Sequence, residues 1–173
     1  KERIASHQDA PRAQERDAHV AIQTLDVTDY SALQSTIAGF DLVVCAVPGF
    51  LGYQTLKVII EAGKDVVDIS FFPENSLELD ALAKQHGVTA IVDCGVAPGM
   101  GNFILGYYNS QLKLTDFECL VGGLPKVKKW PFNYKAPFSP MDVIEEYTRP
   151  ARYVENGKVI VREALTDCEF VEF

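Results

Sequence analysis

The sequence predicts an α/β protein in which a partial, doubly wound parallel sheet is followed by an α+β segment. As far as residue 98, short apolar runs alternate with helical patterns, which is typical of right-handed βαβ units. After Gly99 this alternation is lost, and Asn156-Gly157 between two apolar runs is typical of an antiparallel hairpin with a type I′ turn. We therefore expect a sheet domain over residues 1–98 and an α+β domain over residues 99–173.

The first predicted strand covers residues 20–25, a short run rich in apolar residues. Thr28 then suits the N-cap of a helix, because its hydroxyl can accept a backbone N–H. Leu33 and Ile37 lie about one turn apart on that helix, and Gly39 is suited to its end.

The second predicted strand covers residues 41–47, a nearly continuous apolar run. Such a run is typical of a parallel strand with helices on both faces. Pro48 stops the strand. Leu56 and Ile59 belong to the apolar stripe of the next helix, which Gly63 can cap.

Residues 64–70 and 88–92 are the next two predicted strands. Between them, Asn75-Ser76-Leu77-Glu78 has the spacing of a capping box, so a helix should begin there and end near Gly87. After Gly99 we expect a helix at about 102–112, a strand at 117–121, a short helix at 141–147 and hairpin strands at 152–154 and 159–161.

The segment over residues 92–102 lies where the strand at 88–92 ends, and it contains Asp93, Cys94 and three glycines. Ligands of open parallel sheets bind beside the carboxyl ends of the strands, so this position favours a functional site. A plain turn explains the glycines about as well.

Composition and charge exclude several classes of function. The net charge is −8, and Lys and Arg are clustered only at residues 126–129, which disfavours nucleic-acid and anionic-membrane partners. No apolar run approaches the ~20 residues of a membrane span. The four cysteines form no C-x-x-C pair, so we expect reduced thiols, no zinc site and a cytoplasmic protein.

Several stretches together resemble the saccharopine dehydrogenase-like family of NAD(P)-dependent oxidoreductases, and in particular its bacterial lysine 6-dehydrogenases. The matching stretches occur in family order and comprise residues 25–29, 41–48, 63–70, 93–102, 121–125, 138–140 and 146–152. Family members begin with a strand and a G-x-G-x-x-G loop that binds the cofactor pyrophosphate, and this sequence shows neither. We therefore expect an interior fragment with part of a Rossmann-like NAD(P)-binding domain and part of the C-terminal domain.

The resemblance implies NAD or NADP as cofactor. Loops after successive strands line a dinucleotide in such a sheet. The residues that the resemblance places there are Asp26, Val27, Ala46, Val47, Pro48, Asp68 and Ser70.

Oxidation of an amine requires a base, and the candidates are the carboxylates of Asp93 and Asp68, which end neighbouring strands. Helix capping is an equally good explanation of either residue. Cys94 could handle a proton, although a small buried hydrophobe explains it better.

The resemblance also implies a small amino-acid substrate, whose carboxylate an arginine would bind. Arg149 is the first candidate and Arg152 the second, while Tyr147 or Tyr134 could bound the aliphatic chain. Gly99 and Met100 complete the predicted substrate site.

We expect oxidative deamination of the lysine terminal amine to the semialdehyde, in a homodimer formed through the C-terminal domain. The alternatives are a glutamate-forming saccharopine dehydrogenase, a carboxynorspermidine-type reductase and a non-catalytic dimerisation module.

Overall fold

The computed structural model describes residues 20–123, 125–131 and 139–167. The elements follow one another along the chain as α1 (Tyr30–Ile37), β1 (Leu42–Cys45), α2 (Gly49–Glu61), β2 (Asp65–Asp68), the 3₁₀ turn η1 (Ser76–Leu79), α3 (Asp80–His86), β3 (Ala90–Ile91), α4 (Met100–Asn109), α5 (Pro140–Thr148), β4 (Ala151–Glu155) and β5 (Lys158–Arg162).

Strands β1, β2 and β3 form a parallel sheet in that order. The register places Cys45 beside Asp68, so two polar or polarisable side chains end neighbouring strands. The prediction of a partial doubly wound sheet followed by an α+β segment is confirmed.

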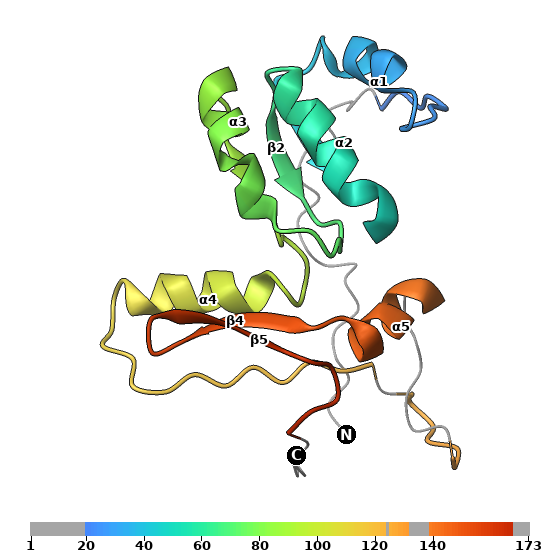
Figure 1. The fold of residues 1–173 in the computed structure, drawn as a ribbon. Coiled ribbons are helices and arrows are strands. Elements are labelled where there is room, and N and C mark those ends of the chain that lie inside the picture. Colours follow the sequence, from blue (N-terminus) through green and yellow to red (C-terminus); the bar gives the residue numbers. More distant parts are fainter. Residues whose placement is uncertain (1–19, 124, 132–138, 168–173) are drawn as a thin grey trace, which may run out of the picture.

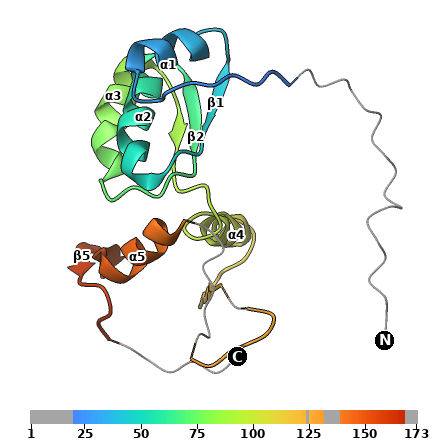
Figure 2. The same cartoon turned by 90° about the vertical axis from the view of Figure 1, so that its right-hand side faces the viewer.

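Helices α1, α2 and α3 gather on one face of this sheet (Figure 2). The core between them is apolar and consists of Leu33, Ile37, Cys45, Leu56, Val58, Ile59, Ile60, Val66 and Leu79. On the opposite face Leu42 and Val44 are exposed, with 54% and 68% of their surfaces accessible. Within the described residues, the expectation of helices on both faces of this strand is therefore wrong.

The ends of the helices largely follow the predicted chemistry. Gly63 follows α2 with φ 68°, and Gly87 ends α3 with φ 66°, where glycine avoids the strain that a Cβ would cause. The Asn75 side chain accepts a hydrogen bond from Leu77 N, as expected of a cap. Helix α1, however, is capped by Asp29, while the Thr28 hydroxyl donates to Asp26.

Two predicted strands are absent from the described structure. Residues 20–25 run without a ladder partner, and Val20 and Ile22 are exposed, because no described strand lies beside them. Residues 117–121 pass along α4 instead of joining a sheet. Cys119 Sγ lies 2.9 Å from the position that a Cβ on Gly101 would occupy.

The remaining elements, helices α4 and α5 and the hairpin of β4 and β5, lie below the sheet (Figure 1). Helix α4 begins at Met100, two residues earlier than expected. Strands β4 and β5 pair in antiparallel register around Asn156 and Gly157, both at positive φ, as a type I′ turn requires. None of the described helices has the length and apolar character needed to cross a membrane.

Candidate active site

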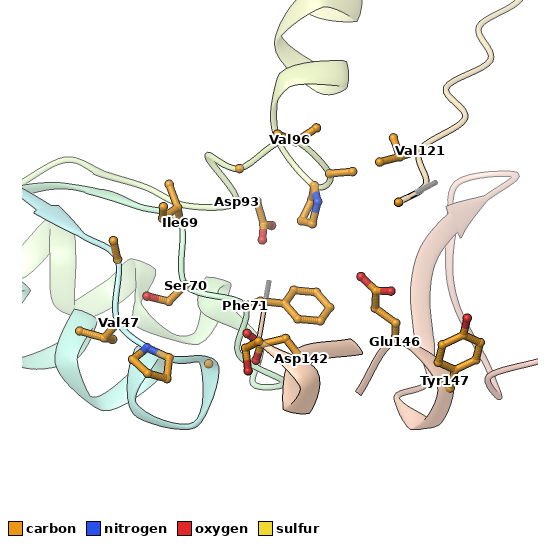
Figure 3. A pocket seen from close by; sticks show the side chains of 18 of the residues that line it. Val47, Ile69, Ser70, Phe71, Asp93, Val96, Val121, Asp142, Glu146 and Tyr147 are labelled. Carbon is orange, nitrogen blue, oxygen red and sulfur yellow. The ribbon is translucent and has the colours of Figure 1, made fainter. Parts of the chain in front are cut away.

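A cavity of about 990 Å³ opens where the strands of the parallel sheet end (Figure 3). Its walls come from the loops after β1, β2 and β3, from the segment at 121–123, from α5 and from Leu165, which follows β5. The described residues that line it are Ala46, Val47, Pro48, Gly49, Ile69, Ser70, Phe71, Asp93, Gly95, Val96, Ala97, Pro98, Val121, Gly122, Gly123, Ser139, Asp142, Glu146, Tyr147 and Leu165.

The wall contributed by β1 and α2 is built from small residues that allow close packing. Gly49 begins α2, and a Cβ on it would lie 2.0 Å from the carbonyl oxygen of Phe71. Only glycine allows the loop after β2 to approach α2 so closely. Together with Ala46, Val47 and Pro48, Gly49 forms the part of the wall at the end of β1, where dinucleotides bind in such sheets.

The loop after β3 brings Asp93 into the cavity. Asp93 has φ 56°, a left-handed conformation that Asp tolerates better than most residues. Gly99, at φ 139°, lies against this loop, where a Cβ would be 2.2 Å from the Gly95 carbonyl oxygen. The tight turn thus directs the Asp93 carboxylate toward the space around the Phe71 ring (Figure 3).

Helix α5 adds two carboxylates that the sequence analysis did not find. Asp142 and Glu146 are four residues apart, so they lie on one face of α5, and both line the cavity together with Tyr147. The Glu146 carboxylate points toward the same space as that of Asp93 (Figure 3). The i, i+4 spacing was visible in the sequence, but it could not show against which surface α5 would pack.

Charge in the cavity wall is of one sign. Three carboxylates, those of Asp93, Asp142 and Glu146, line the cavity, and none of its described lining residues is Lys, Arg or His. The part of the wall that carries these carboxylates favours a cationic group of a ligand.

Asp68 lies beneath the cavity and is completely buried. Its Oδ1 accepts a hydrogen bond of 2.8 Å from Ser70 N, and its Oδ2 accepts one of 3.2 Å from Ser70 Oγ. Desolvation raises the pKa of the Asp68 carboxyl, and the negative charge of Asp93 adds to this effect. Ser70 lines the cavity, whereas Asp68 reaches it only through Ser70.

The cysteines near the site are held as neutral thiols. Burial raises the pKa of the Cys45 thiol to about 11, and Cys45 Sγ lies 3.6 Å from Ser70 Oγ. Burial also raises the pKa of Cys94, whose Sγ donates to the carbonyl oxygens of Ile91 and Val92. In the described part of the chain, Cys45, Cys94 and Cys119 are free, and no group of His, Cys, Asp and Glu is suited to a metal ion.

Arg149 lies behind the cavity wall. Its side chain is paired with Glu145, and its Nη2 donates a hydrogen bond of 3.3 Å to the Phe71 carbonyl oxygen. Its guanidinium also lies over the Phe71 ring, with Cζ 4.1 Å from the centroid. Phe71 thus separates Arg149 from the cavity that it helps to line.

The other predicted site residues divide into two groups. The structure brings Ala46, Val47, Pro48, Ser70, Asp93 and Tyr147 together in the cavity wall. Asp26, Val27, Cys94, Gly99, Met100 and Arg152 lie outside that wall, and Tyr134 falls outside the described residues. Asp26 accepts hydrogen bonds from the Thr28 hydroxyl and amide, which lower the pKa of its carboxyl.

Two family models match the chain along nearly its whole length. The saccharopine dehydrogenase NADP binding domain matches residues 2–91, and the saccharopine dehydrogenase C-terminal domain matches residues 95–172. The chain belongs to the saccharopine dehydrogenase family. This is a family of NAD(P)-dependent enzymes, and the cavity lies at the strand ends of its cofactor-binding domain.

Individual relatives support the family assignment. The chain is 30% identical over 143 residues to saccharopine dehydrogenase [NADP(+), L-glutamate-forming] of Pyricularia oryzae, covering 79% of this chain and 32% of that protein. It is 28% identical over 159 residues to alpha-aminoadipic semialdehyde synthase of Arabidopsis thaliana, covering 88% of this chain and 15% of that protein. The chain thus spans a third or less of these relatives.

A solved structure shares the fold. Apo histidine-tagged saccharopine dehydrogenase (L-Glu forming) from Saccharomyces cerevisiae superimposes with a TM-score of 0.53 at 24% identity, covering 82% of this chain and 33% of that one. These family relatives carry saccharopine dehydrogenase and semialdehyde synthase names, so the narrower lysine 6-dehydrogenase assignment stays a prediction.

Proposed function

We propose that the protein oxidises the primary amine of a small amino acid with NAD(P), and that lysine, attacked at its terminal amine, is the substrate. The observation that carries this proposal is the acidic cavity at the strand ends of an NAD(P)-binding domain, with Asp93, Asp142 and Glu146 in its wall. An ammonium group is the part of an amino acid that such a wall favours.

The residues present fit a dinucleotide on the side of β1 and α2. The small or uncharged residues Ala46, Val47, Pro48 and Gly49 line that side, and Gly49 lets α2 pack directly against the loop after β2. The volume of about 990 Å³ is at the upper end of that of ordinary ligand pockets, which suits a cofactor together with a small substrate. When bound, NAD(P)⁺ would accept a hydride from the carbon that carries the amine.

Asp93 is our candidate for the general base. It lines the cavity from a rigid turn, whereas Asp68 is fully buried below the wall. The Asp93 carboxylate would take a proton from the substrate ammonium, leaving the nitrogen lone pair free to form the imine as the hydride departs. Water would then add to the imine, and the products would be ammonium and an aldehyde.

The α5 side of the cavity would hold the rest of the substrate. Asp142 and Glu146 would attract the α-ammonium group of the substrate, and Tyr147 would contact its aliphatic chain. We keep Arg149 as the candidate partner of the substrate carboxylate, although it would have to exchange its present contacts with Glu145 and Phe71 to reach it.

A glutamate-forming saccharopine dehydrogenase is the second candidate, because relatives of the chain bear that name. Saccharopine carries three carboxylates, and its binding would require cationic partners. None of the described lining residues provides one.

A first experiment separates an enzyme from a non-catalytic module. Titration of the full-length protein with NADH and NADPH should give saturable binding of at least one of them. Assays of NAD(P)⁺ reduction with lysine and with saccharopine, run in parallel, then distinguish the two enzymatic candidates. Reduction with lysine is the expected result, and absence of dinucleotide binding would contradict the proposal.

We also propose a homodimer that uses the hairpin. Val154, Val159 and Val161 on β4 and β5 are all more than half exposed. Light scattering of the full-length protein should give twice the chain mass, and a monomer at micromolar concentration would contradict this arrangement.

A further inference from the structure

Asp68 is placed where the three strand ends that build the cavity meet. Its side chain bonds the loop after β2, through Ser70 N and Ser70 Oγ. Its backbone carbonyl accepts a hydrogen bond of 3.0 Å from Cys94 N in the loop after β3. On the other side, Ile69 N donates to the Cys45 carbonyl oxygen at the end of β1, also at 3.0 Å.

The bond from Ser70 N to Asp68 Oδ1 closes an Asx turn, in which a side chain replaces a backbone acceptor two residues earlier. This turn takes the chain out of the sheet, so that Ile69, Ser70 and Phe71 become consecutive residues of the cavity wall. Helix α2 closes on the turn from the opposite side. A Cβ on Gly52 would lie 2.7 Å from Ser70 Cβ, so glycine at this position is what allows α2 to pack so closely against the turn.

Burying a carboxylate costs free energy because its charge is removed from water. An apolar side chain is therefore the usual residue at a buried strand position that serves packing alone. Asp68 has no exposed surface, and a valine would fill such a strand position without desolvating a charge. Each oxygen of Asp68 is bonded to the same cavity residue, Ser70. Besides its interaction with the Cys45 thiol at the end of β1, the Asp68 carboxylate thus fixes the conformation of the cavity wall.

We propose that Asp68 is a positioning residue, which acts through its turn with Ser70 to hold the wall at residues 69–71 in the shape that binds the dinucleotide. This inference rests on the proposed function, because it takes the cavity to be the cofactor site. In this proposal Asp68 holds the wall in place and is not the general base. The turn needs only an acceptor oxygen at Oδ1, so an amide can replace the carboxylate while an apolar side chain cannot.

Two substitutions in the full-length protein test this proposal, with the dissociation constant of NADPH, followed by its fluorescence, as the readout. Asp68→Asn keeps the acceptor and should leave the dissociation constant within about threefold of wild type, whereas Asp68→Ala should raise it by about tenfold or more. Asp68→Val fills the buried site better than alanine and replaces Asp68→Ala in the test if the alanine variant does not fold. Its NADPH dissociation constant should be raised to the same extent.

Thr55→Val is the matched control for loss of a buried polar group. Thr55 is 3% exposed and its hydroxyl donates only to the Leu51 carbonyl oxygen within α2. This variant should change thermal stability without changing NADPH affinity.

Two results would overturn the inference: an unchanged NADPH dissociation constant in the apolar Asp68 variants, or an equal loss of affinity in Asp68→Asn. If the wild-type protein binds neither NADPH nor NADH, the proposed function fails together with the inference. Normal wild-type binding with unaffected apolar variants would remove the inference alone.

Discussion

The guanidinium of Arg149 lies 4.1 Å from the centroid of the Phe71 ring, and its Nη2 also bonds the Phe71 carbonyl oxygen at 3.3 Å. Arg149 follows α5, and Phe71 follows β2, so this pair joins α5 to the carboxyl end of β2. The position of Asp142 and Glu146 in the cavity wall therefore depends on it.

Arg149→Ala should lower stability and raise the KM for the amine substrate, because α5 would lose its connection to Phe71. The cation–π contact and the charged hydrogen bond together suggest a loss of about 1–3 kcal/mol in the free energy of unfolding. Denaturant unfolding and steady-state kinetics measure the two effects.

Arg149→Lys is the control for charge alone. Lysine keeps the positive charge beside Glu145 but lacks the planar guanidinium that stacks on Phe71. It should recover only part of the stability. Wild-type stability in this variant would show that stacking of the planar guanidinium on Phe71 contributes nothing.

Gly49→Ala should be strongly disruptive. The new Cβ would lie 2.0 Å from the Phe71 carbonyl oxygen, so α2 and the loop after β2 would have to separate. We expect a loss of about 1–3 kcal/mol in the free energy of unfolding and weaker NADPH binding.

Gly106→Ala provides the comparison, because Gly106 is also helical and no atom lies within 4 Å of its added Cβ. Alanine should stabilise α4 there by about 0.5–1 kcal/mol. Equal effects of the two substitutions in thermal unfolding would refute the close-packing argument for Gly49.

Asp93→Asn should lower kcat by about 10²–10⁴-fold while leaving NADPH affinity unchanged, since the base is lost and the cofactor wall is kept. Asparagine tolerates the left-handed φ of 56°, so the turn should survive. Asp93→Ala should show the same catalytic loss together with about 1–2 kcal/mol of strain. A wild-type kcat in Asp93→Asn would remove this residue from the mechanism.

Asp68 should make stability depend on pH. Burial raises the pKa of this carboxyl above its unfolded value, so the folded protein binds the proton more tightly. The resulting contribution to stability is fully present below the unfolded pKa of roughly 3.9 and is lost as pH rises through the folded pKa.

Asp68→Asn carries no ionisable group at this position. Its melting temperature relative to wild type should therefore increase as pH rises from acid to neutral. The groups that face Asp68 are Cys45 and Ser70, with Asp93 and Cys94 nearby. A melting-temperature difference that stays constant with pH would contradict a raised pKa.

The sequence predicted the elements whose signals are local. Caps at Asn75, Gly63 and Gly87 work through hydrogen bonds and φ angles within one turn, so their residue types were sufficient evidence. The predicted strand at 20–25 failed because a strand needs a neighbour, and an apolar pattern cannot show whether one is present. The predicted strand at 117–121 failed for the same reason.

The sequence predicted the part of the candidate site that lies at the ends of the parallel strands. The carboxyl ends of parallel strands converge, which correctly brought Ala46, Ser70 and Asp93 into one cavity. The contribution of α5 depends on how a distant helix packs, so Asp142 and Glu146 were missed. Burial was equally hidden, since nothing in the sequence separates the enclosed Asp68 from the accessible Asp93.

The identity of the nitrogen compound released on NAD(P)⁺ reduction tests the account most directly. Full-length protein should be supplied in separate reactions with lysine and with saccharopine, and ammonium and glutamate should be quantified against the reduced cofactor. The acidic cavity predicts one ammonium released from lysine for each NAD(P)H formed. Glutamate formation from saccharopine, with no turnover of lysine, would contradict the assignment of the cavity to a cationic amine.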